Sequence, residues 1–265
     1  MINTSTIKEL RQMRLPGMAR ELEAQLEAPQ TYKHLDFEAR IALIVEAEQA
    51  SRKENTIRRR IKEARLTDSQ ACIEAIEYHE DRHLDQRLIT KLSTCAFIPE
   101  NHHIFIKGPT GAGKTFLGSA FGNCACRKQY KVRYVRLPDL LNEASVAKGT
   151  GSWAKVKQTY AKFDLLIIDE WLLRPLPEAE SYDLLEFIDA CSRKGSLIIC
   201  TQYDPDEWYY RIDCDRPEDA DSTVAEAILD RLIHNKYTIN IEGNVSMRKR
   251  HAFAQQEESG VTGNG

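Results

Sequence analysis

The segment Gly108-Pro109-Thr110-Gly111-Ala112-Gly113-Lys114-Thr115 has the residue types and spacing needed to hold a phosphate group. It fits the pattern G-x-x-x-x-G-K-[ST] at every fixed position. Its glycines allow backbone conformations that a Cβ would forbid, so that several N–H groups can point at one anion. The Lys114 ammonium can reach the terminal phosphates of a nucleotide, and the Thr115 hydroxyl can ligate Mg²⁺. The segment therefore predicts a site for a nucleoside triphosphate and Mg²⁺.

The residues on either side of this loop decide between a phosphate site and a Gly-rich turn that matches by chance. Residues 104–107 are mostly apolar and predict a short strand before the loop, and residues 116–127 predict a helix after it. A helix that starts at the loop directs the positive end of its dipole at the same anion. The strand–loop–helix order favours the phosphate site.

Two acids, Asp169 and Glu170, follow the apolar run 165–168. The run is too short for a helix and predicts a central strand of a parallel sheet, covered on both faces. Ligands of α/β sheets bind at the carboxyl ends of the strands. We expect Asp169 to hold the Mg²⁺ shell and Glu170 to orient or deprotonate the attacking water. The alternative is a strand end with two solvated acids.

Strands and helices alternate from residue 104 onward. Strands are predicted at 104–107, 132–135, 165–168, 197–200 and 237–241, with helices at 116–127, 138–147, 182–192 and 225–235. This alternation predicts an α/β fold with a five-stranded parallel sheet and helices on both faces, over residues 104–256. If the strand 197–200 lies between the first and third strands, Thr201 and Gln202 reach the γ-phosphate. That strand order is typical of hydrolysing ATPases.

Residues 1–65 predict a small all-α unit with a basic end. They hold 13 Lys and Arg residues against 10 Asp and Glu, whereas the whole chain has a net charge of −3. The cations gather in 52–65, which has seven basic and two acidic residues. This cluster is either a solvated helix face or a contact surface for the phosphates of DNA. The candidate DNA contacts are Arg52, Lys53, Arg58, Arg59, Arg60 and Lys62.

The remaining segments predict a connector, a surface loop and a disordered tail. Residues 66–103 form a connector, in which 68–87 predicts a polar helix. His79 and His83 stand four residues apart there without an evident third metal ligand, so a surface helix is the favoured interpretation. Residues 204–221 are acidic and predict a surface loop, and residues 257–265 predict a disordered tail.

Cysteine usage and hydropathy bear on the compartment of the protein. The seven cysteines include no C-x-x-C pair, which favours free thiols in a reducing compartment. No apolar run approaches the roughly 20 residues needed to span a bilayer. We therefore expect a cytoplasmic protein with no membrane partner.

Five motifs follow one another in a fixed order along nearly the whole chain. They are Leu15-Pro16-Gly17-Met18-Ala19, Gly108 to Thr115, Leu165 to Trp171, Ile228-Leu229-Asp230-Arg231-Leu232 and Met247-Arg248-Lys249. This ordered set resembles the motifs of the IstB family of transposition helper ATPases, which are AAA+ proteins related to DnaC-type helicase loaders. One departure is Leu172, where the family usually has Gly.

The resemblance implies an ATPase that self-associates in the presence of ATP, binds duplex DNA and assists a cognate transposase. It implies that Thr201 or Gln202 is the sensor-1 residue, that Arg231 is an arginine finger acting on a neighbouring subunit, and that Arg248 is the sensor-2 residue. Both arginines could instead be surface salt-bridge partners. No C-terminal helical lid is expected.

Two other functions fit the same nucleotide site. A DnaC-type replicative helicase loader would use its N-terminal unit for the helicase and prefer single-stranded DNA. A small-molecule kinase would form no oligomer on DNA and would not need Arg231.

Overall fold

The computed structural model describes residues 2–217, 221–243, 245–250 and 252; the predicted tail 257–265 lies outside them. The chain divides into two compact units, Met1–Arg59 and Arg60–Gly265.

The first unit is helical, as predicted. It contains α1 (Ile2–Gln12), α2 (Pro16–Glu27) and most of α3 (Phe37–Ala64). Pro16 occupies the first turn of α2, where its missing N–H costs nothing. A Cβ on Gly17 would lie 2.5 Å from the Ala47 carbonyl oxygen, so only glycine lets α2 approach α3 this closely. The buried Glu48 carboxylate accepts the Gly17 N–H at 2.8 Å and so caps α2.

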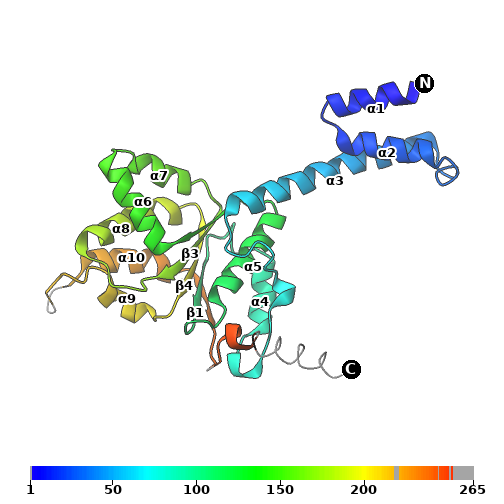
Figure 1. The fold of residues 1–265 in the computed structure, drawn as a ribbon. Helices are drawn as coiled ribbons and strands as arrows, with labels where there is room; N and C mark the ends of the chain where they lie inside the picture. Colours follow the sequence, from blue (N-terminus) through cyan, green and yellow to red (C-terminus); the bar gives the residue numbers. More distant parts are fainter. Residues whose placement is uncertain (1, 218–220, 244, 251, 253–265) are drawn as a thin grey trace. The chain divides into compact units, whose positions relative to one another are not determined.

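The second unit is built on a five-stranded parallel sheet with helices on both faces (Figure 1). The strand order is β2-β3-β4-β1-β5. Strand β4 therefore lies between β1 and β3, and the predicted inserted strand is confirmed. The strands are β1 (His103–Lys107), β2 (Val132–Arg136), β3 (Leu165–Trp171), β4 (Ser196–Thr201) and β5 (Lys236–Asn240).

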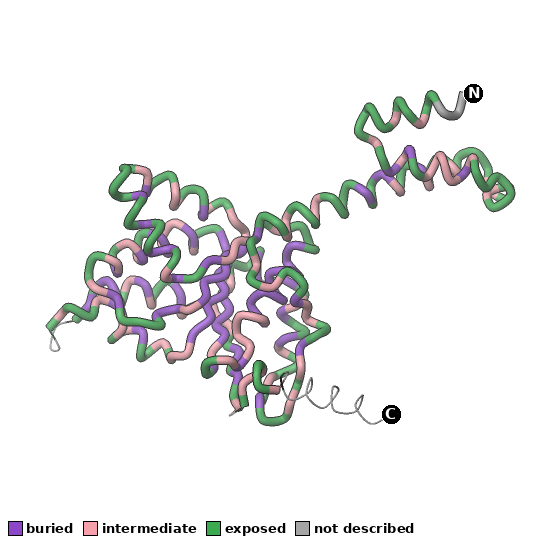
Figure 2. The backbone as a smooth tube through the Cα atoms, viewed as in Figure 1, coloured by how far each residue is buried: buried purple, intermediate pink, exposed green. Residues whose placement is uncertain are grey.

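Alternate residues of the central strands enter two cores, because successive side chains of a strand point to opposite faces. Phe105, Leu166 and Ile199 face one core, while Ile104, Ile167 and Ile198 face the other. Figure 2 shows this buried centre of the sheet. The second unit includes the helices α4 (Gln86–Ser93), α5 (Lys114–Arg127), α6 (Leu137–Gly149), α7 (Trp153–Tyr160), α8 (Glu178–Ser192), α9 (Pro205–Arg211) and α10 (Thr223–Ile233).

The predicted polar helix at 68–87 is wrong. The segment holds two short 3₁₀ turns, η1 (Ile73–Ala75) and η2 (Glu80–Arg82), before α4 begins. The Asp68 carboxylate accepts the N–H groups of Gln70 and Ala71, which forms a turn where the helix was expected. His79 and His83 pair with Glu77 and Glu242 instead of sharing a helix face. Within the described residues no group of three or more His, Cys, Asp or Glu is placed to hold a metal ion.

The predicted surface loop at 204–221 is also partly wrong, because it contains α9. Asp204 and Glu207 form a capping box that starts the helix, with Pro205 at its first position. Trp208 is fully buried and packs on Trp171, with ring centroids 5.4 Å apart. Burial of one large aromatic residue stabilises the helix in a segment whose composition is that of a loop.

Candidate nucleotide-binding site

The Gly-rich loop lies between the end of β1 and the start of α5. Gly111 and Gly113 have φ angles of +80° and +95°, a region that favours glycine. Gly108 is needed for a different reason, because a Cβ there would lie 2.6 Å from the Ile241 carbonyl oxygen. Gly113 is the N-cap of α5, so the positive end of the helix dipole faces the loop.

The loop presents unused backbone donors. The N–H groups of Gly111, Gly113, Lys114 and Thr115 have no acceptor among the described residues. Those of Lys114 and Thr115 belong to the first turn of α5, which has no intrahelical acceptors. Donors gathered at a helix N-terminus in this way form an anion site.

Lys114 lies within this loop. Its Nζ donates to the carbonyl oxygens of Gly108 and Pro109 at 2.8 and 2.9 Å. An ammonium has three donors, so one remains for a phosphate oxygen. Burial lowers the pKa of the Lys114 ammonium, while the Asp169 carboxylate acts in the opposite sense.

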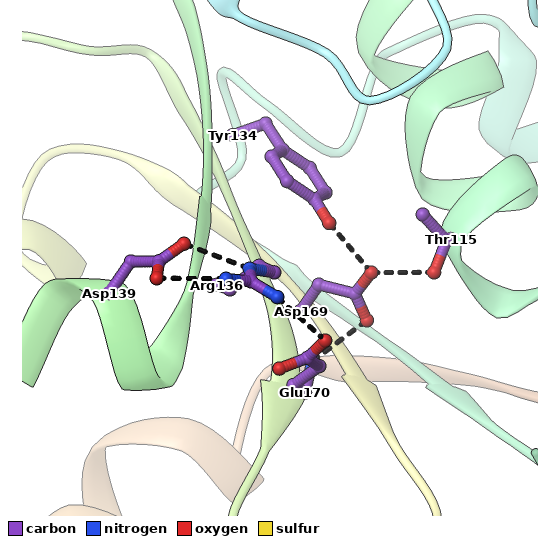
Figure 3. A network of polar contacts seen from close by, with 6 residues as sticks. All are labelled: Thr115, Tyr134, Arg136, Asp139, Asp169 and Glu170. Carbon is purple, nitrogen blue, oxygen red and sulfur yellow. Dashed lines mark hydrogen bonds and ion pairs between the residues drawn. The ribbon is translucent and has the colours of Figure 1, made fainter.

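Asp169 stands at the centre of a polar network at the end of β3 (Figure 3). Its Oδ2 accepts hydrogen bonds from the Thr115 hydroxyl at 2.6 Å and the Tyr134 hydroxyl at 2.8 Å. Its Oδ1 accepts the N–H of Glu170 at 2.8 Å. The side chain is 4% exposed, and the three donors fix the direction of its carboxylate. The loop and the acidic strand end therefore meet at one point.

Glu170 is held beside this network in an unusual backbone conformation. Its φ is +55°, and the register of β3 against β4 shifts between Ile168 and Trp171. Such irregularities redirect a side chain and concentrate at functional sites. The Glu170 Oε1 lies 3.4 Å from Nη1 of Arg136, whose guanidinium also pairs with Asp139 at 2.8 Å (Figure 3).

The end of β4 contributes Thr201 and Gln202. Thr201 is buried, and its hydroxyl accepts the Tyr203 N–H at 3.1 Å. The Gln202 Oε1 accepts the Thr110 hydroxyl at 3.2 Å, so its side chain reaches the loop itself.

A cavity of about 220 Å³ joins these groups, with Lys114, Thr115, Asp169, Glu170, Thr201, Gln202 and Arg248 in its wall. A second cavity of about 690 Å³ extends from Thr115 and Asp169 along β2. Arg248 lines both cavities. Arg231 lines neither; its Nε pairs with Asp189 at 3.0 Å and its Nη1 donates to the Ala227 carbonyl. The structure thus brings the predicted nucleotide residues together, except Arg231.

Comparison with known proteins identifies the family. Residues 8–255 match the family described as IstB-like ATP binding protein. The chain belongs to this family. ATP binding by this chain is supported by the family assignment, and the resemblance predicted from the sequence is confirmed.

Two curated relatives agree with this assignment. A protein of Pseudomonas fluorescens named for ATP binding and insertion sequence IS1162 is 39% identical over 76% of this chain and 87% of its own length. A Sinorhizobium fredii protein, also named for insertion sequences and ATP binding, is 34% identical over 94% of this chain and 98% of its own.

Solved structures share the AAA+ fold of this IstB-like chain. DnaA from Aquifex aeolicus with bound AMPPCP superposes with a TM-score of 0.54 at 19% identity, over 72% of this chain and 56% of that one. DnaI superposes with a TM-score of 0.50 at 16% identity, over 66% of this chain and 89% of that one. No helix in the described part of the chain is long and apolar enough to cross a membrane.

Tyr134 and Arg136 belong to the site of this IstB-like protein although sequence analysis did not predict them. Both lie on β2, which was predicted as 132–135. Arg136 is the residue at the carboxyl end of β2, and the rule that placed Asp169 and Glu170 would also have selected it. Tyr134 gave no such signal, because its hydroxyl meets Asp169 only after β2 pairs with β3.

Proposed function

We propose that this chain hydrolyses ATP as a self-associating, DNA-binding ATPase that assists the transposase of an insertion sequence. One observation carries the hydrolytic part: the Glu170 carboxylate lies beside the Thr115–Asp169 pair at the phosphate loop. A site that only bound ATP would not need this second acid. Relatives named for insertion sequences support the biological setting.

The donor set fits Mg²⁺. The Thr115 hydroxyl and the Asp169 carboxylate supply hard oxygen ligands, and Mg²⁺ is commonly held by one or two such groups together with substrate phosphates. The ion would neutralise charge on the β- and γ-phosphates during transfer. In this assignment Asp169 and Thr115 hold the ion and Tyr134 orients the Asp169 carboxylate.

Different residues of the chain bind the phosphates and accept the proton from water. The loop N–H groups and Lys114 bind the phosphates, while Gln202 and Arg248 stand at the cavity where the γ-phosphate belongs. Glu170 accepts a proton from water as the water oxygen bonds to the γ-phosphorus. The bond from that phosphorus to the bridging oxygen breaks, which leaves ADP and phosphate.

Arg231 acts on a neighbouring copy in this proposal. It lines neither cavity of its own chain, yet a cation that stabilises the transition state must reach the γ-phosphate. A second subunit can supply it, which couples ATP turnover to assembly. The acting sensor-1 residue in this proposal is Gln202, since its side chain reaches the phosphate loop, whereas the Thr201 hydroxyl is buried and bonded to Tyr203.

The preference for duplex or single-stranded DNA distinguishes this function from that of a helicase loader. With ATP present, we expect filter binding to show tighter binding to duplex than to single-stranded DNA of equal length. Tighter binding to single strands would favour the loader. A small-molecule kinase would show neither DNA binding nor an effect of Arg231→Ala on turnover.

A further inference from the structure

Arg82 is a buried cation that touches the phosphate loop from the connector. It ends the turn η2 and is 4% exposed. Its Nη2 donates to the Ala112 carbonyl at 2.9 Å, and its Nη1 donates to the Glu77 carbonyl. Burial lowers the pKa of the guanidinium, although the Glu77 and Asp81 carboxylates act in the opposite sense. Its buried Nε has no hydrogen-bond partner among the described residues. Burial of such a charge costs free energy of folding, so its retention at the phosphate loop suggests a role there.

The backbone of Arg82 is anchored on two sides. Its N–H donates to the His79 carbonyl at 3.0 Å, and its carbonyl accepts the Glu242 N–H at 3.1 Å. The same C-terminal segment contacts the loop again, where the Met247 N–H donates to the Gly111 carbonyl at 3.0 Å. The guanidinium is therefore held in place by elements outside the loop.

The contact with Ala112 determines where the next N–H group points. A trans peptide is planar, and its C=O and N–H point in opposite directions. When Arg82 holds the Ala112 carbonyl, the N–H of Gly113 must point away from Arg82. That N–H has no acceptor among the described residues and belongs to the donors around the anion site.

Arg82 also polarises this peptide. A charge-assisted bond to the carbonyl strengthens the N–H of the same peptide as a donor. The absence of a side chain at Gly113 leaves room for the guanidinium, since a Cβ there would lie 3.1 Å from the Arg82 Nη2.

We infer that Arg82 is a positioning residue for phosphate binding, which aims the Gly113 N–H at the nucleotide through the Ala112 carbonyl. This inference deepens the nucleotide site and does not depend on hydrolysis or DNA binding. It predicts that removal of the guanidinium weakens binding of a nucleoside diphosphate beyond any decrease in fold stability.

The test measures ADP affinity by calorimetry, and thermal unfolding with and without ADP, for the full chain. Arg82→Met should raise the Kd for ADP by about tenfold, as expected when a charge-assisted bond in the binding loop is removed. Arg82→Lys keeps a cation but cannot bridge both carbonyls, and should raise the Kd by a smaller factor.

Arg216→Met is the matched control. The Arg216 Nη1 also donates to backbone carbonyls, those of Tyr209 and Ile212, but at neither cavity of the nucleotide site. This variant should keep the wild-type Kd within about twofold, because it removes similar hydrogen bonds at a separate place in the fold.

The outcomes separate the possible failures. If folded Arg82→Met binds ADP like wild type and only its melting temperature falls, Arg82 supports the fold alone and the inference is overturned. If Arg82→Met does not fold, an unchanged Kd in Arg82→Lys overturns it in the same way. If wild type itself binds no ADP, the nucleotide site is wrong, which is a different result.

Discussion

The proposed hydrolysis depends on the Glu170 carboxylate as its general base. Its φ of +55° and the adjacent shift in strand register turn it out of the regular sheet, and Arg136 pairs with it. A general base contributes roughly 10²- to 10⁴-fold to a rate, so its removal should be visible without any effect on binding.

Glu170→Gln is expected to bind ATP like wild type and to lose at least about a hundredfold in turnover, because the amide cannot accept the proton from water. Phosphate release and calorimetry with ATP measure the two properties separately. Glu178→Gln, an exposed site at the start of α8, controls for the removal of one charge. Failure of Glu170→Gln to bind ATP would contradict the role of base.

Leu172 combines an unfavourable backbone conformation with a buried side chain. It stands where the IstB family usually has Gly, and its φ is +50°, but its side chain is fully buried. Relief of a left-handed leucine is worth about 1–2 kcal/mol. Truncation of a buried leucine costs about 2–5 kcal/mol. Packing is therefore the larger effect.

Leu172→Gly should lower the free energy of unfolding by about 2 kcal/mol, the difference between the midpoints of these two ranges. Urea denaturation monitored by tryptophan fluorescence measures it, with Leu173→Gly at the more exposed neighbour as the comparison. Equal or greater stability of Leu172→Gly would show that backbone strain outweighs the burial.

At the scale of elements, the sheet could be predicted because its signals are local. Apolar runs such as 165–168 and the loop 108–115 identify strands and their order along the chain. The connector turns and α9 could not be predicted, because they depend on burial of Ile76 or Trp208 against distant segments. The contacts of Tyr134 and Arg82 join residues 35 and 30 positions apart, which no local pattern encodes.

Helix α3 carries the proposed DNA contacts. Arg52, Arg58 and Arg60 pair with glutamates on the same helix. Lys53 and Lys62 are exposed and have no ion-pair partner among the described residues. Their charges are the most available to phosphates, since competing acids do not neutralise them.

Lys53→Glu with Lys62→Glu should weaken duplex binding and flatten its salt dependence by about 0.9 in log–log slope for each DNA phosphate that the variant no longer neutralises. Fluorescence anisotropy over a salt series measures both quantities. Lys155→Glu with Lys194→Glu makes the same change in net charge at exposed sites outside α3. If both pairs of substitutions act alike, the basic stretch is only a solvated face.

At the scale of the whole molecule, the proposed active site belongs to two chains. One copy supplies the loop, Asp169 and Glu170, and the neighbour supplies Arg231. In the isolated chain Asp189 pairs with Arg231, and α8 and α10 hold both residues at a fixed position. If Arg231 instead contacts the γ-phosphate bound by a neighbouring copy, it loses this exposed ion pair with Asp189. Such a pair contributes little to stability, and the contact with the phosphate is stronger.

Mixing two inactive variants tests this claim most directly. Arg231→Ala and Glu170→Gln should each lose at least about a hundredfold in ATP turnover, the first because an arginine finger supplies that much or more. An equimolar mixture should recover up to about a quarter of wild-type turnover, since random neighbours place an intact Arg231 beside an intact Glu170 at that fraction of sites. The double variant mixed with Arg231→Ala should recover nothing. Turnover in the first mixture that equals the average of its two components, or full activity of Arg231→Ala alone, would contradict a site shared between chains.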